Sequence, residues 1–233
     1  MSNASDMEKC LAYISAHTKP TIKSTKPAIQ RQTVTISRQS GTGAMVVAEK
    51  LSELLETHAP EHGAWTVFNR NIVETVLKDH NLPVELAKYM PENRVSATQD
   101  MLEELFGLHP ASMTLVRQTA ETIHHLATLG NVVLVGRGSS VITRALCNVF
   151  HIRLVAPLDQ RIERVMKQNK LTCKASTDFI KTEEQARRLY LKDNFKADID
   201  DPLLYDIVIN MARITPDEAA RLIGEAVLDR AKK

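Results

Sequence analysis

The sequence has few cysteines, little net charge and no long apolar run. Its three cysteines, Cys10, Cys147 and Cys173, lie far apart and form no C-x-x-C or Cys/His spacing, which argues against a structural zinc site and a disulfide framework. With no apolar run of membrane-spanning length and no secretory signal pattern at the start, we expect a cytoplasmic protein without a membrane partner. A formal net charge of +2 over 233 residues is too small to suggest nucleic acid as an obligate partner.

The sequence also lacks a lysine where a phosphate-binding loop would place one. A strand pattern at 33–37 is followed by glycines at 41 and 43, and then by apolar residues at helical spacing over 45–55. A helix start carries unpaired N–H groups and partial positive charge, so a glycine loop there predicts an anion cradle. In the form G-x-x-x-x-G-K-[ST], a lysine and a hydroxyl complete the loop. Here Ala44 stands at the lysine position and Met45 or Val46 at the hydroxyl position.

Candidate strands and helices alternate along the rest of the chain. Further strands are predicted at 64–68, 131–135, 149–155 and 205–210. Helices are predicted at 70–79, 82–89, 96–106, 112–129, from 158 onwards, at 182–195, and from the capping pattern Thr215-Pro216-Asp217-Glu218 to nearly 233. Residues 169–181 lack strong periodicity, and we expect a mobile segment there. The alternation predicts an α/β fold with a mainly parallel five-stranded sheet.

The first 32 residues differ in character from the rest. A short helical pattern is followed by a Ser/Thr/Lys-rich stretch that Lys19-Pro20 and Lys26-Pro27 interrupt. We expect an N-terminal helical arm and linker over 1–32 and one domain over 33–233. The arm can dock on the domain or on a neighbouring subunit, so a homo-oligomer formed through the arm stays open.

Two arginine-containing features suggest an anionic ligand. The apolar run at 131–135 is typical of a buried parallel strand and leads directly into Gly136-Arg137-Gly138. Ligands of open α/β sheets bind at the carboxyl ends of strands, so Arg137 is a candidate ligand residue, the alternative being an ordinary turn with a surface arginine. Residues 151–197 carry eleven Lys or Arg against six acids, which suits an anionic ligand or, alternatively, a solvated helical face.

Four stretches in this order resemble the cytidylate kinase-like family, a branch of the nucleoside monophosphate kinases within the P-loop fold. They are TVTISRQSGTG, VVLVGRGSS with HIRLVAPLDQRIERV, ARRLYLKDNF and DPLLYDIVIN, and the similarity covers roughly residues 33 to 228. The resemblance implies a P-loop kinase-type three-layer fold with a helical acceptor-site insertion and an arginine-rich lid.

The resemblance also assigns roles to individual residues. The phosphate-binding loop would be formed by Ser40, Gly41, Thr42, Gly43, Ala44 and Met45. The acceptor would lie near Asn69, Arg70, Gly136 and Arg137, and the lid would carry Arg161 and Arg164. Charge on the transferred phosphoryl group would be stabilised by Arg137, Arg187 and Arg188. Independently of the resemblance, Arg38 lies two residues before Ser40 and could turn toward the loop as a further catalytic charge. For Arg38, a surface charge is the equal alternative.

The glycine loop departs from the pattern of its relatives, which often read G-S-G-G-R and carry an arginine directly after the glycines. This sequence has neither that arginine nor the lysine. ATP and Mg²⁺ are expected from the resemblance, and no structural metal is expected. The metal would use Ser37, Ser40 or Thr42 in place of the usual hydroxyl, or would be held mainly by nucleotide and water.

Three functional hypotheses follow from these observations. The first is an ATP-dependent kinase of a nucleoside monophosphate, most simply CMP or dCMP, with a small-molecule nucleotide as its partner. The second is a nucleotide- or phosphate-binding regulatory module of the same fold that has lost the chemistry. In the third, the glycine loop is purely structural, because glycines after a strand are a weak signal.

Overall fold

The computed structural model describes residues 31–58, 63–69 and 112–231. The helices predicted between 70 and 106, Arg70 and most of the expected N-terminal arm lie outside the described residues. None of the helices in the described part of the chain is both long enough and apolar enough to cross a membrane.

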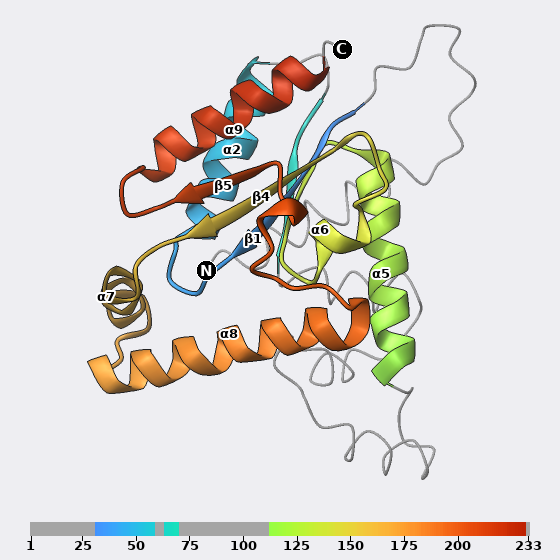
Figure 1. Ribbon diagram of the computed structural model, residues 1–233. Helices are drawn as coiled ribbons and strands as arrows, with labels where there is room; N and C mark the ends of the chain where they lie inside the picture. Colours follow the sequence, from blue (N-terminus) through green and yellow to red (C-terminus); the bar gives the residue numbers. More distant parts are fainter. Residues whose placement is uncertain (1–30, 59–62, 70–111, 232–233) are drawn as a thin grey trace, which may run out of the picture.

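A five-stranded sheet forms the centre of the molecule (Figure 1). Its strands are β1 (Thr33–Arg38), β2 (Thr66–Phe68), β3 (Val132–Val135), β4 (Val149–Val155) and β5 (Ile207–Asn210). They lie in the order β2-β3-β1-β4-β5, and every pairing is parallel. The predicted α/β fold and its sheet are confirmed. Because β1 lies between β3 and β4, the glycine loop that follows β1 lies at the middle of the sheet's carboxyl edge.

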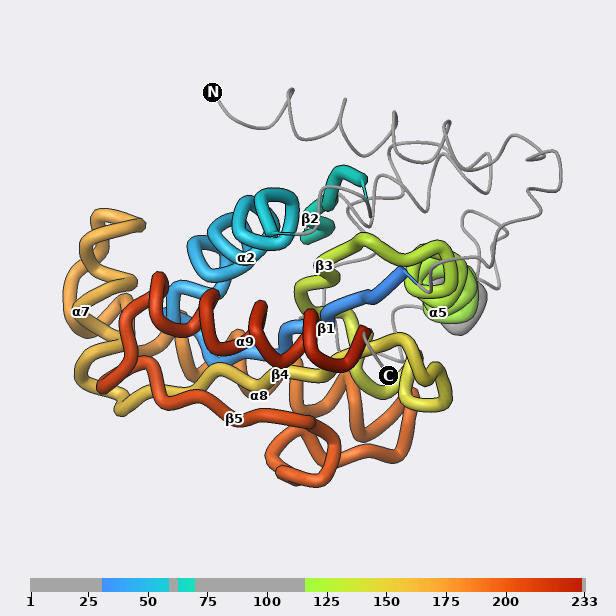
Figure 2. Tube along the Cα trace, turned by 90° about the horizontal axis from the view of Figure 1, so that it is seen from above, coloured from blue at the N-terminus to red at the C-terminus, as the bar shows by residue number. Residues whose placement is uncertain are grey.

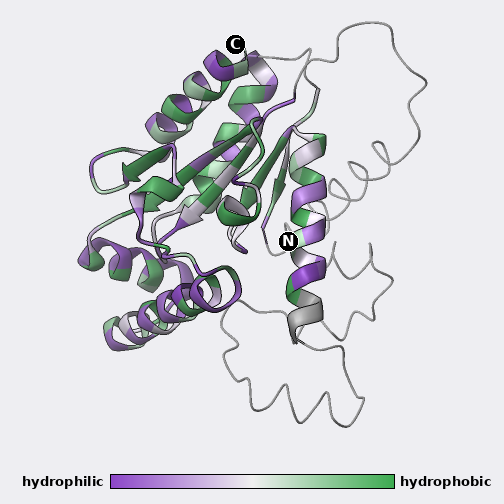
Figure 3. Cartoon of the chain, turned by 45° about the vertical axis from the view of Figure 1, so that its right-hand side comes forward, coloured by the Kyte–Doolittle hydropathy of each residue, from purple (hydrophilic) through white to green (hydrophobic). Residues whose placement is uncertain are grey.

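Helices cover both faces of this sheet. On one face, α2 (Ala44–His58) and α9 (Pro216–Ala231) pack side by side (Figure 2). The core there joins apolar residues of the central strands to Leu51 of α2 and Ile223 of α9, both fully buried. On the other face, α5 (Ser112–Leu129) is tied to β1 by a hydrogen bond from Thr33 Oγ1 to Ala127 O at 3.0 Å. In Figure 3 the strands are mainly hydrophobic, while α7 and α8 carry mostly hydrophilic residues.

Two helices form the lid, which we define as α7 (Leu158–Asn169) and α8 (Cys173–Phe195). The mobile segment predicted at 169–181 and the helix start predicted at Thr182 are wrong, because α8 begins ten residues earlier, where Thr172 Oγ1 accepts a hydrogen bond from Ala175 N. Ser176, Ile180, Arg187 and Leu191 are buried at helical spacing, but two of the four are polar. An apolar periodicity therefore could not reveal the helix.

The start of α9 agrees with its predicted capping box. Thr215 N donates to Glu218 Oε2 at 2.8 Å, and Glu218 N donates back to Thr215 Oγ1 at 3.3 Å. The hydrogen bond from the Thr215 backbone also holds the pKa of Glu218 below its ordinary value. Two short elements complete the fold: α6 (Ser139–Ile142) after β3, and the 3₁₀ turn η3 (Pro202–Leu204) before β5.

Candidate functional site

The glycine loop, residues 40–43, makes a tight turn between β1 and α2. Gly41 and Gly43 have φ angles of +81° and +82°, a region that favours glycine. A Cβ on Gly41 would lie 2.6 Å from the carbonyl oxygen of Arg161, so α7 packs directly against the loop. Thr42 is buried and donates from Oγ1 to Gln39 O at 2.8 Å. The loop is therefore fixed by a hydrogen bond from its own Thr42 and by the close packing of α7 against it.

Ala44 at the usual lysine position and Met45, one of the two candidates for the hydroxyl position, pack in the hydrophobic core, whereas Val46, the other candidate, is 39% exposed. Ala44 is 6% exposed and lies within the core cluster between the sheet, α2 and α9. Met45 packs against the same cluster. Because these side chains serve packing, any positive charge for a phosphate must come from other elements.

Two arginines of α7 bind the loop through its carbonyl groups. Arg161, which is buried, donates from Nε to Ala156 O at 2.8 Å and from Nη1 to Ser40 O at 3.4 Å. Arg164 donates from Nη1 to Gly41 O at 2.8 Å. These guanidinium groups hold the loop in place, a role that was not predicted when Arg161 and Arg164 were assigned to the lid.

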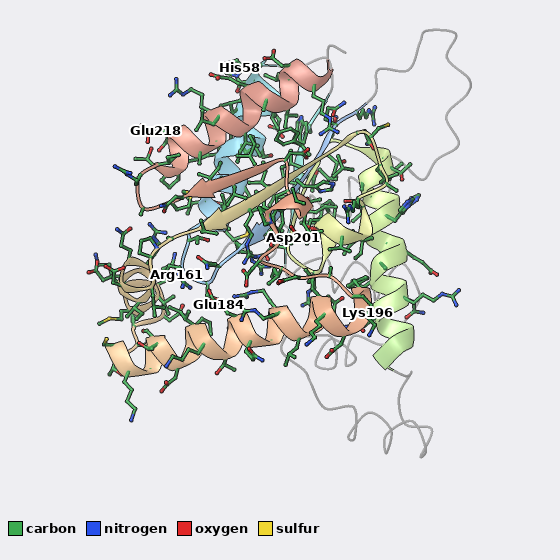
Figure 4. The ribbon with its side chains drawn as sticks, viewed as in Figure 1. His58, Arg161, Glu184, Lys196, Asp201 and Glu218 are labelled. Carbon is green, nitrogen blue, oxygen red and sulfur yellow. The ribbon has the colours of Figure 1, made fainter. Side chains whose placement is uncertain are left out.

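Residues of α8 contact the loop from a second side. Arg161 also forms an ion pair with Glu184, whose Oε1 accepts a hydrogen bond from Ser40 N at 3.3 Å (Figure 4). Arg187 donates to Ser40 Oγ and pairs with Glu183 at 3.2 Å. A carboxylate thus lies on the first backbone amide of the loop, where an anion would otherwise bind.

Beside the loop, the structure brings together several of the predicted site residues in one pocket, called the arginine pocket below. It lies between the carboxyl ends of β1 and β3 and the helix α8. Its lining consists of Ser37, Arg38, Gly136, Arg137, Gly138, Ser139, Ser140, Arg187, Tyr190, Leu191 and Ile199. Arg38, Arg137 and Arg187 therefore line the same space from three different elements.

Arg137 occupies an unusual backbone conformation. Its φ angle is +56°, between Gly136 at +87° and Gly138 at +70°. A left-handed conformation costs a non-glycine residue about 1–2 kcal/mol. The glycine at 138 leaves room for α8, because a Cβ there would lie 3.1 Å from the ring of Phe195. The strained residue therefore lies in the lining of the arginine pocket.

Arg188 and Asn69 are among the predicted site residues that do not line the pocket. Arg188 faces away and pairs with Asp200 at 2.6 Å, linking α8 to the segment before β5. Burial alone would raise the pKa of Asp200, but the hydrogen bond from Arg188 and the charges of Arg153 and Arg188 outweigh it and hold the pKa below its ordinary value. Asn69 follows β2, at the outer end of the same carboxyl edge.

Sequence reasoning missed several residues near the pocket. Arg153 is 5% exposed in β4 and hydrogen-bonded to Ser37, and a charged residue inside the apolar run VFHIRLV was a visible signal of it. Glu184 was assigned no role beyond its place in the helix predicted at 182–195, although it contacts the glycine loop. Tyr190 in the pocket lining had no sequence signal beyond its place on a helix.

The three hydroxyls proposed from sequence as Mg²⁺ ligands do not fit that role. Ser37 Oγ accepts from Arg153 Nη1 at 2.8 Å, and Ser40 Oγ accepts from Arg187. A guanidinium on an oxygen opposes a cation on the same atom. Thr42 is buried and committed to a carbonyl. Of the two sequence-based alternatives, a Mg²⁺ held by nucleotide and water is the one compatible with these contacts.

Comparisons with known proteins concern the family and the fold separately. Residues 33–213 match the model of the cytidylate kinase-like family. The chain is 30% identical over 78 residues to a cytidylate kinase of Natronomonas pharaonis and 27% identical over 131 residues to a uronate isomerase of Corynebacterium glutamicum. The first match covers 34% of this chain and 41% of that protein; the second covers 56% and 25%.

Among solved structures, an uncharacterized protein from Eubacterium ventriosum has a similar fold. The two structures superpose with a TM-score of 0.63, over 85% of this chain and 99% of that one. Their sequences are 19% identical, so this likeness concerns the fold alone.

Proposed function

Because the chain belongs to the cytidylate kinase-like family, we propose that it transfers a phosphoryl group from ATP to a nucleoside monophosphate, with CMP and dCMP as the simplest acceptors. The observation that carries the proposal is the arginine pocket, in which Arg38, Arg137 and Arg187 face one space beside the glycine loop. Phosphoryl transfer requires mainly in-line positioning and positive charge around the equatorial oxygens. Planar guanidinium groups from three elements suit that requirement.

In the proposed reaction, Arg137 binds the phosphate of the acceptor at the carboxyl end of β3. Arg187 lies between the two substrates, because it lines the pocket and also contacts Ser40 of the glycine loop. Arg38 adds charge from the end of β1. Arg161 and Arg164 keep the loop in position, and Arg188 holds α8 closed through Asp200. The lid then excludes water during transfer.

A second candidate function is a phosphate-binding regulatory module without turnover. It is favoured by the carboxylate of Glu184 on Ser40 N and by the absence of a basic side chain directly after the glycines. Loss of a cation that contacts the transferring phosphate lowers the rate by orders of magnitude but weakens binding much less. Such a module would bind nucleotide in the arginine pocket and leave it unchanged.

Turnover with a panel of monophosphates separates the two functions. We would incubate the purified chain with ATP and Mg²⁺ and with CMP, dCMP, UMP, AMP or GMP, and quantify both nucleoside diphosphates. Formation of ADP and one other diphosphate in equal amounts supports the kinase. Binding of a monophosphate by calorimetry without turnover supports the regulatory module, and the absence of both contradicts the two proposals.

A variant of Arg137 tests the role of the pocket itself. Arg137→Gly removes the guanidinium and relieves the strained backbone, so we expect stability to change by no more than about 1 kcal/mol. For a kinase, kcat/KM should fall at least about 100-fold. Lys170→Gly is the matched control, because Lys170 is an exposed cation with a φ of +53° at the end of α7. Equal activity of the two variants would remove Arg137 from the site.

A further inference from the structure

A buried arginine lies directly behind the arginine pocket. Arg153 of β4 is the cross-strand partner of Ser37 at the end of β1. Its Nη1 donates to Ser37 Oγ at 2.8 Å and its Nη2 donates to Asp200 Oδ1 at 2.9 Å. The guanidinium carbon also lies 5.8 Å from the centre of the Tyr205 ring. Three partners from three segments fix this side chain, and one of them, Ser37, lines the pocket.

The protons of this network can be counted. The hydroxyl of Tyr205 lies 2.8 Å from Ile199 O and 3.3 Å from Ser37 Oγ. A carbonyl only accepts, so the single proton of Tyr205 goes to Ile199. Arginine only donates, so Ser37 Oγ accepts from Arg153. The proton of Ser37 is therefore free to donate, either over the long 3.3 Å contact to Tyr205 or into the pocket.

We propose that Ser37 is a binding residue for an anionic phosphoryl oxygen in the arginine pocket, and that Arg153 is its positioning residue. The inference rests on the proposed function, because it takes the pocket to bind a phosphate. Arg153 fixes the oxygen of Ser37 and polarises its O–H bond, which strengthens donation to an anion. The same bond disfavours a metal cation at Ser37. Without a ligand, the Ser37 hydroxyl donates to Tyr205 as its resting acceptor over the long contact. A bound phosphoryl oxygen takes the place of Tyr205 as the acceptor.

The test measures binding of inorganic phosphate and of CMP to the full chain by titration calorimetry. Ser37→Ala should weaken both about tenfold, since a hydrogen bond to a charged group is lost. Ser37→Thr, which keeps the hydroxyl, should bind within about threefold of the wild type. Tyr205→Phe, which removes the resting acceptor together with the hydrogen bond to Ile199 O, should bind at least as tightly as the wild type. A Ser37→Ala protein that binds like the wild type overturns the inference, and so does a Ser37→Thr protein that binds no better than Ser37→Ala.

A double-mutant cycle tests the positioning role of Arg153. Arg153→Lys keeps the charge but loses the fork that reaches both Ser37 and Asp200, so we expect weaker phosphate binding in the wild-type background and little further loss in Ser37→Ala. Equal losses in both backgrounds overturn the positioning role. If the lysine variant does not fold, the three variants above still test the binding role of Ser37. Failure of the wild type to bind either probe overturns the proposed function as well, whereas binding that is insensitive to Ser37 overturns this inference alone.

Discussion

The carboxylate of Glu184 on α8 accepts a hydrogen bond from the backbone N–H of Ser40 at 3.3 Å, while Arg161 of α7 donates to the same carboxylate oxygen. A backbone amide of the glycine loop is thus already in contact with a negative charge from the protein. A phosphate that uses this amide has to displace Glu184 or bind beside it.

Glu184→Gln should therefore increase the affinity for inorganic tripolyphosphate. The variant keeps the shape of the side chain and removes the negative charge next to the loop, so we expect binding about tenfold tighter by calorimetry. Asp178→Asn, on the exposed side of the same helix, is the control and should bind as the wild type does. Weaker or unchanged binding in Glu184→Gln would show that the carboxylate does not compete with the anion.

Gly41→Ala should destabilise the fold more than Gly43→Ala. Both glycines have φ near +80°, so both variants pay backbone strain of about 1–2 kcal/mol. At Gly41 the new Cβ also meets Arg161 O at 2.6 Å, whereas at Gly43 the nearest atom is Arg164 Nη1 at 3.6 Å. We expect an additional loss of about 1–3 kcal/mol for Gly41→Ala in urea denaturation. Equal losses would mean that α7 moves away without cost.

Ala44→Lys, which restores the usual lysine position, should destabilise the protein without adding activity. The side chain at 44 enters the core, so a lysine there must either lose hydration or push α2 away from the sheet. We expect a loss of about 1–3 kcal/mol in the free energy of unfolding. Val46→Lys is the control, because Val46 is 39% exposed in the same helical turn. A stable Ala44→Lys variant with faster turnover would contradict this account of the loop.

The buried His151 should make stability depend on pH below about 6.5. Burial lowers its pKa below 6.5, Arg230 and Arg144 act in the same direction, and Asp206 opposes them. Its Nδ1 lies 2.7 Å from Thr35 Oγ1. Because the unfolded chain takes up the proton more readily, stability is highest above pH 6.5 and falls as the pH drops towards the folded pKa.

The measurement is urea denaturation of the wild type and of His151→Gln at several pH values. Between neutral and acidic pH, the free energy of unfolding should fall less in the variant than in the wild type. The difference should be about 1.4 kcal/mol for each pKa unit by which folding lowers the pKa of His151. Identical slopes would mean that other groups cause the dependence.

Much of the fold could be predicted because its signals are local. The buried strand at 149–155 and the helix at 112–129 agree with their predicted bounds, since apolar runs and helical spacing are read within one segment. The first half of α8 was missed because Ser176 is buried there at a position where a pattern of apolar residues would need an apolar side chain, and Arg187 is buried in the same way in the predicted half. Their burial depends on partners elsewhere, as the contact of Arg187 with Ser40 shows.

The candidate site was predictable in its residue types and less so in its contacts. Arg137 was expected near a ligand because it follows a buried strand, and its place in the pocket with Arg38 follows from β3 pairing with β1. That Arg161 and Arg164 hold the loop, and that Arg188 pairs with Asp200, depends on how α7 and α8 cross the sheet edge. Contacts between segments that are far apart in the chain cannot be predicted from the spacing of residues within one segment.

The position of β1 between β3 and β4 has a consequence for synthesis of the chain. Thr33 pairs with Val132 and Val149, which are about 100 and 115 residues later. At 5–20 residues per second, β1 leaves the ribosome roughly 5–20 s before either neighbouring strand has been made. During that time Val34 and Ile36, both fully buried in the finished protein, have no sheet to join. The nascent chain should therefore depend on chaperone protection of its first strand.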